Sequence, residues 1–80
     1  MKKLLYFMAS WCSPCKRLKP IVEKEAPEQG YDVEILDIED DDDSIIAESY
    51  NVRSVPTIIV IENGKETKRA VGNTAWEEVK

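Results

Sequence analysis

The chain has 80 residues, 42% of them hydrophobic, and its 11 Lys and Arg against 16 Asp and Glu give a formal charge of -5. This length fits a single small domain over residues 1–80, because a core of this size is already only marginally stable. Two cysteines and no histidine exclude a closed structural zinc site, which needs about four ligands, and a scaffold of several disulfides. The acidic balance argues against a nucleic-acid-binding module, whose contact surface is basic.

An apolar run over residues 4–9 follows two lysines at the start of the chain. It is shorter than the roughly 7–15 residues of a signal-peptide core, and no window approaches the roughly 20 apolar residues of a membrane span. A lipid anchor on Cys12 is disfavoured because the large Trp11 precedes it. We therefore expect a cytoplasmic protein with no membrane partner, and a short buried strand over Lys3–Met8.

The first helix is expected from Cys15 to about Gln29, where apolar side chains recur at helical spacing. Ser13 followed by Pro14 is typical of a helix start, with Ser as the cap and proline in the first turn. A second proline, Pro20, lies inside the expected helix and should kink it. The glycine at position 30 should end it.

The middle of the chain carries a second strand, an acidic run and a second helix. Val33–Ile38 alternates apolar and acidic side chains, the pattern of a half-buried strand. Five consecutive acids follow at residues 39–43, and because the other 11 acids balance the 11 bases, this run accounts for the whole net charge. We expect it to be a solvated loop leading into a short helix over Ser44–Asn51, close to the positive end of the helix dipole. It lacks the spaced ligands, mid-loop glycine and closing Glu of a calcium loop.

The last third of the chain predicts a hairpin and a short helix. Thr57–Ile61 is a β-branched run typical of a central buried strand. Asn63-Gly64 is a strong hairpin signal, so Lys65–Val71 should return antiparallel. After Gly72-Asn73, Thr74–Lys80 should form a helical turn or two. The order β-α-β-α-β-β-α predicts an α/β fold, with a four-stranded mixed sheet whose faces are covered by helices.

The two cysteines carry the chemistry that the rest of the sequence lacks. Cys12 and Cys15 follow a strand and flank a helix start, which brings both sulfurs to one side of the first turn, within bridging distance. A helix N-terminus stabilises the thiolate, which is the reactive form. Cys12 lies before the first turn, where solvent can reach it, and is the expected nucleophile; Cys15 lies inside the helix and is the expected resolving thiol. Half of a metal site and an inert pair are the alternatives, disfavoured because no other Cys or His is present.

Residues 8–16, Met-Ala-Ser-Trp-Cys-Ser-Pro-Cys-Lys, resemble the active-site segment of thioredoxins, usually W-C-G-P-C-K. Pro20 matches the proline that kinks the active-site helix, and residues 50–57 resemble the segment that carries the cis-proline of the family. Asn63-Gly64 and Val71-Gly72 match the hairpin and the glycine that closes the site. The resemblance covers nearly the whole chain. It implies a thioredoxin fold and dithiol–disulfide exchange through a Cys12–Cys15 disulfide, with no cofactor and no metal.

The resemblance also implies roles for residues outside the cysteine pair. Pro56 would be cis, with its loop against Cys12, and the Val55 backbone would pair with an extended substrate strand. Gly72 would close the substrate-binding site. Trp11 would form an exposed wall beside the thiols, the alternative being a core aromatic. Trp76 is expected to pack the last helix.

The departures from the family pattern are informative. Thioredoxins usually carry a further strand and helix before the active-site strand and a longer final helix, so this chain resembles a minimal, glutaredoxin-sized form. Tyr6 replaces a buried Asp that is thought to assist proton transfer at the resolving cysteine, which leaves water or the Tyr6 hydroxyl for that step. Ser13 replaces the usual Gly and should tune the redox potential, while Pro14 favours the reducing character of the family.

We therefore expect a monomeric protein-disulfide reductase that takes electrons from a thioredoxin-reductase-type donor or from glutathione. Ribonucleotide reductase is the first substrate to consider, because small relatives often serve it. A glutaredoxin is the near alternative, although its usual Gly-Gly-x-Asp stretch is here Gly72-Asn73-Thr74. A binding module with a structural disulfide and a carrier of a metal or cluster are the alternatives from other classes.

Overall fold

The computed structural model describes residues 1–80, which form four strands and three helices in the predicted order. The strands are β1 (Lys2–Met8), β2 (Tyr31–Asp37), β3 (Thr57–Glu62) and β4 (Lys65–Val71); the helices are α1 (Ser13–Glu28), α2 (Asp41–Ser49) and α3 (Ala75–Val79). The predicted α/β fold with a four-stranded mixed sheet is confirmed. None of the helices is long and apolar enough to cross a membrane.

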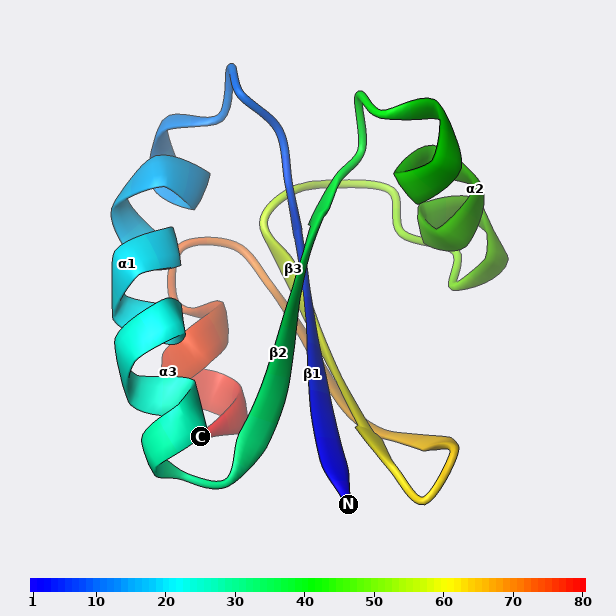
Figure 1. Ribbon diagram of the computed structural model, residues 1–80. Helices are drawn as coiled ribbons and strands as arrows, with labels where there is room; N and C mark the ends of the chain where they lie inside the picture. Colours follow the sequence, from blue (N-terminus) through cyan, green and yellow to red (C-terminus); the bar gives the residue numbers. More distant parts are fainter.

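The sheet has the order β2-β1-β3-β4, so the first strand of the chain lies in its interior. β1 runs parallel to β2 and antiparallel to β3, and β3 pairs antiparallel with β4. The carboxyl ends of β1 and β2 therefore meet the amino end of β3 at one end of the sheet. Figure 1 shows that the loops after β1, after β2 and before β3 gather at this end, at the top of the view.

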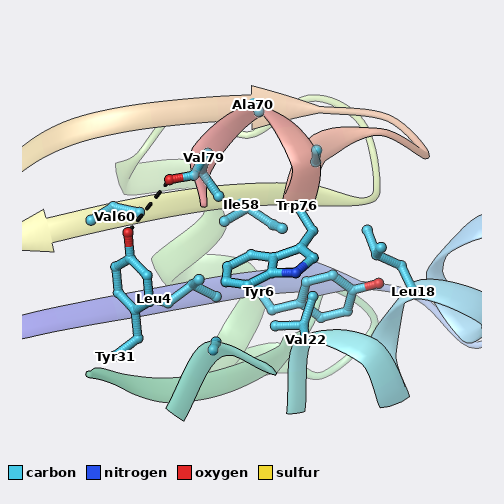
Figure 2. Close-up of a cluster of buried hydrophobic side chains, with 12 residues drawn as sticks. Leu4, Tyr6, Leu18, Val22, Tyr31, Ile58, Val60, Ala70, Trp76 and Val79 are labelled. Carbon is cyan, nitrogen blue, oxygen red and sulfur yellow. Dashed lines mark hydrogen bonds between the residues drawn. The ribbon is translucent and has the colours of Figure 1, made fainter. Parts of the chain in front are cut away.

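The alternation of side chains along β1 assigns the two faces of the sheet. Leu4 and Tyr6 point to the face covered by α1 and α3, whereas Leu5 and Phe7 point to the face covered by α2 (Figure 1). Figure 2 shows the larger cluster, in which the Trp76 indole of α3 lies over the Tyr6 ring. The side chains that α1 buries are Cys15, Leu18, Val22 and Ala26.

The start of α1 differs from the prediction in its cap. Cys12, and not Ser13, is the N-cap residue: its backbone is extended (φ -91, ψ 105) and its side chain accepts the Cys15 N–H. Pro14 lies in the first turn as expected. The pattern of Ser and Pro located the helix start to one residue, but the sulfur takes the capping position that the Ser hydroxyl was expected to hold.

The start of α2 also differs, because the helix begins at Asp41 and not at Ser44. Asp40 caps it by accepting the Asp43 N–H at 3.0 Å. Residues 41–43 therefore form the first helical turn, and the expectation of a solvated loop over the whole acidic run is wrong. Three carboxylates at the positive end of a helix dipole are a favourable arrangement, which explains why the helix extends into the run.

The hairpin between β3 and β4 has the predicted turn. Asn63 and Gly64 both have positive φ, 53 and 82, as a tight two-residue hairpin turn requires. A register shift at Val60/Ile61 places one extra residue on β4, which is a β-bulge and increases the local twist.

Candidate active site

Cys12 and Cys15 form a disulfide at the start of α1, with their Cα atoms 5.2 Å apart. The turn that leads into it is closed by the Cys12 N–H, which donates to the Ala9 carbonyl at 3.1 Å. The Cys15 N–H donates to Cys12 Sγ at 3.2 Å. Cys12 is 5% exposed and Cys15 is completely buried. Both cysteines are therefore buried, and Cys12 is the more exposed residue of the two.

The loop before β3 packs against this disulfide. The Val55–Pro56 peptide bond is cis, and the Val55 side chain contacts the cluster formed by Ala9, Cys12 and Cys15. The cis bond expected for Pro56 from the resemblance is thus confirmed. Neither the N–H nor the C=O of Val55 takes part in a backbone hydrogen bond within the chain.

Gly72 holds the same loop from the other side. Its N–H donates to the Pro56 carbonyl at 2.9 Å, and its φ of 101 lies in the region that favours glycine. The Thr57 hydroxyl donates to the Ser54 carbonyl at 2.6 Å. Two hydrogen bonds therefore fix the loop whose Val55 lies against the disulfide.

The two tryptophans are divided as the sequence predicted. Trp11 is 65% exposed next to Cys12, so it is not a core aromatic. Trp76 is buried, and its indole N–H donates to Glu25 Oε1 at 2.7 Å. The Glu25 partner was missed by the sequence analysis, because nothing in the local sequence links α1 to the last helix.

Tyr6 lies behind the disulfide. It is fully buried, and its hydroxyl donates to the Cys15 carbonyl at 2.7 Å. Burial, with a smaller contribution from Glu23, raises the pKa of Tyr6 to about 12. The hydroxyl is therefore protonated throughout the physiological range.

A second contact that the sequence analysis missed joins Ser10 to the acidic run. Both the Ser10 hydroxyl (2.6 Å) and the Ser10 N–H (3.2 Å) donate to Glu39 Oε1. These hydrogen bonds lower the pKa of Glu39. Ser10 and Glu39 follow two parallel neighbouring strands, so their proximity could have been inferred from the predicted sheet once β1 and β2 were paired.

The surface has two shallow hollows, neither of which is lined by Cys12 or Cys15. One, of about 270 Å³, is lined by Pro14, Arg17, Leu18, Ile21 and Asn73. The other, of about 220 Å³, lies along α2 and includes Ile38, which also contacts the disulfide cluster. No three His, Cys, Asp or Glu side chains come together in a way that could hold a metal ion.

A Cys-x-x-Cys disulfide at the start of a helix, facing a cis-proline loop at one end of a β2-β1-β3-β4 sheet, defines a thioredoxin-fold redox protein. The thioredoxin family model matches residues 1–80. The chain belongs to the thioredoxin family.

Individual relatives agree with this assignment. Over 66 residues the chain is 47% identical to a thioredoxin of Mycoplasma genitalium, covering 82% of this chain and 64% of the relative. It is 45% identical over 69 residues to a thioredoxin of Chlamydia trachomatis, covering 86% of this chain and 67% of that protein. Thioredoxin 1 of Thermosipho africanus has a similar structure, with a TM-score of 0.85 and 30% identity over 96% of this chain and 84% of that one. The chain spans about two thirds of the length of these two curated relatives.

Proposed function

We propose that this chain is a thiol–disulfide oxidoreductase that reduces protein disulfides with the Cys12/Cys15 pair. The observation that carries the proposal is the position of that pair, at the N-terminus of α1 and against the Val55–Pro56 loop. The family supports the same chemistry, since relatives of 45% and 47% identity are thioredoxins.

Cys12 is the nucleophile in this proposal and Cys15 the resolving thiol. In the disulfide, Cys12 Sγ accepts the Cys15 N–H at the start of α1. The same bond to a Cys12 thiolate is charge-assisted and favours the reactive form. The thiolate attacks one sulfur of the substrate disulfide, so that a mixed disulfide forms and one substrate thiolate leaves with a proton from solvent. Cys15 then attacks Cys12 Sγ, the mixed disulfide breaks and the second substrate thiol leaves. Two electrons pass to the substrate, and a thioredoxin-reductase-type donor or glutathione must return them.

The substrate-binding residues of the proposal surround Cys12. The exposed Trp11 offers a flat apolar wall, and the free N–H and C=O of Val55 can pair with an extended substrate strand. Pro56 and Gly72 act by holding that loop in place, because the Gly72 N–H donates a hydrogen bond to the Pro56 carbonyl. The hollow that includes Pro14, the residue before Cys15, can take a substrate side chain.

Ser13 and Pro14, between the cysteines, are the residues that tune the redox potential in this proposal, and Pro14 favours a reducing value. A reductase of this kind belongs in the cytoplasm, where thiols are kept reduced. The protein acts as a monomer, and ribonucleotide reductase is the first substrate to try.

Insulin reduction tests the proposal. One reaction receives electrons from thioredoxin reductase and NADPH, and the other from glutathione, glutathione reductase and NADPH, with Cys12→Ser as the inactive control. We expect turnover with thioredoxin reductase and none for Cys12→Ser. Turnover with glutathione alone would make the protein a functional glutaredoxin. A folded chain that is silent in both reactions would overturn the reductase activity and favour a binding module.

A further inference from the structure

The hydrogen bond from Tyr6 to Cys15 joins the interior strand of the sheet to the helix turn that carries the resolving cysteine. Tyr6 lies on β1 between Ile35 of β2 and Ile58 of β3. Its ring is packed under Trp76, and its hydroxyl points towards α1 near Leu18 (Figure 2). The hydroxyl donates a hydrogen bond to the Cys15 carbonyl at 2.7 Å. A rigid, buried ring on a central strand therefore fixes the height of that turn above the sheet.

The same geometry makes Tyr6 a poor proton carrier. A relay must pass its own proton onward as it accepts one, and the Tyr6 proton is directed at an amide carbonyl, which is not basic in water. The pKa of Tyr6, raised to about 12 by burial, leaves almost no phenolate at neutral pH. The hydroxyl is thus suited to hold the turn in place and unsuited to take the thiol proton.

The surroundings of the disulfide contain no other buried acid or base. Its apolar neighbours are Ala9, Met8, Ile38 and Val55, and no Asp, Glu, Lys or Arg side chain of the chain is buried. On α1, the charged residues Lys16 and Glu23 are exposed and Lys19 is half-buried, and Glu39 is exposed and bound to Ser10. The Cys15 proton must therefore pass to solvent and from there to the departing substrate thiolate, which balances the resolving step without a further reactant.

We propose that Tyr6 is a positioning residue for the resolving step, acting by holding the Cys15 carbonyl so that the Cys15 sulfur is aimed at Cys12 Sγ. The inference rests on the proposed function and deepens it. Because Cys12 precedes the helix and is held by its own bond to the Ala9 carbonyl, loss of the Tyr6 hydroxyl affects the second step and leaves the first. A small misalignment of reacting atoms is sufficient to slow a displacement severalfold.

Reduction of 5,5′-dithiobis(2-nitrobenzoate) by the reduced 80-residue chain separates the two steps. Attack by Cys12 releases one thionitrobenzoate, and attack by Cys15 releases the second, so absorbance in stopped flow reports two phases. The test variant is Tyr6→Phe, which removes only the hydroxyl. The matched control is Tyr31→Phe, which removes another buried tyrosine hydroxyl that also donates to a carbonyl, that of Val79 at 3.5 Å, away from the site.

We expect Tyr6→Phe to slow the second phase about three- to tenfold between pH 6 and 9, with the midpoint of its pH profile unchanged. The first phase should be unchanged, and Tyr31→Phe should match the wild type in both. An unaltered second phase in Tyr6→Phe would overturn the inference, and so would a shifted pH midpoint, which indicates an acid–base role. Equal slowing by both variants would also overturn it, because that result indicates general loosening.

A second variant covers the case in which Tyr6→Phe does not fold. 3-Fluorotyrosine incorporated at position 6 alone keeps the ring and the hydroxyl but lowers the pKa of the phenol. Positioning predicts an unchanged pH midpoint for the second phase, whereas an acid–base role predicts a midpoint moved to lower pH. A wild-type chain that releases no thionitrobenzoate would overturn the proposed function itself. Release of both equivalents by a wild type that Tyr6→Phe matches would overturn only the role of Tyr6.

Discussion

Reduction of the Cys12–Cys15 disulfide should destabilise the fold by an amount that can be worked from its position. The sequence separation of the bonded cysteines is 3, so the bridge closes a very short loop. Loop-closure entropy for such a loop contributes about 2 kcal/mol at 25 °C. The reduced chain recovers about 1 kcal/mol, because the Cys15 N–H then bonds to a thiolate and not to a neutral sulfur. The oxidised chain should therefore be more stable by about 1–2 kcal/mol.

Urea unfolding at pH 7, with and without dithiothreitol, measures this difference directly. The expected loss on reduction corresponds to a decrease in Tm of about 4–16 °C for a domain of this length. The double variant Cys12→Ser/Cys15→Ser is the control, since its stability should not respond to the reductant.

The sign of the difference is the decisive result. A disulfide is an oxidant when the reduced form of the folded protein is the more stable one. If the reduced chain unfolds at the same urea concentration as the oxidised chain, or at a higher one, the thiolate is stabilised by at least as much free energy as loop closure contributes. The reasoning above would then be wrong, and so would the reducing character expected from Pro14.

Three further outcomes follow from individual contacts. Asp40→Ala should lower the free energy of unfolding by about 1 kcal/mol because it removes the cap of α2, whereas Asp40→Asn keeps an acceptor and should cost little; equal losses in urea unfolding would mean that charge and not capping matters. Trp11→Ala should change stability by less than about 0.5 kcal/mol yet lower kcat/KM for insulin about tenfold, and an unchanged kcat/KM would remove Trp11 from the substrate site. The pKa of Glu39 is lowered from 4.5 by its bonds from Ser10, so its stabilising effect is present above pH 4.5 and is lost as the pH falls through the folded-state pKa. Ser10→Ala should therefore flatten the acid limb of the stability profile measured between pH 3 and 6, and an unchanged limb would contradict this.

Much of the fold could be predicted from local sequence alone. The β-branched run of β3 and the Asn63-Gly64 turn placed the hairpin, because both signals depend on neighbouring residues. The helix starts were less accurate, since capping is decided by which nearby side chain reaches the free N–H groups. At α1 the Cys12 sulfur does so, and at α2 the Asp40 carboxylate does so earlier than expected.

Some features of the candidate site could likewise be predicted from the local sequence, and others could not. Cys12 and Cys15 were identifiable from their spacing and from the helix start between them. The cis bond at Pro56 could be expected only from the resemblance, because few X-Pro bonds are cis in folded proteins. The bonds from Tyr6 to Cys15 and from Ser10 to Glu39 join residues 9 and 29 positions apart. They depend on how the elements pack, which no local pattern encodes.

The interior position of β1 has a consequence for the growing chain on the ribosome. β1 is synthesised before both of its sheet neighbours, and its antiparallel partner β3 extends to Glu62, which pairs with Lys2. β2 can pair with β1 once Asp37 has been synthesised, but the other edge of β1 stays unpaired until most of residues 1–80 have been synthesised. Both cysteines also emerge well before the Val55 loop that covers them. During synthesis the thiols are exposed to other proteins, so the redox state of the surrounding compartment, and not the finished site, controls their chemistry at that stage.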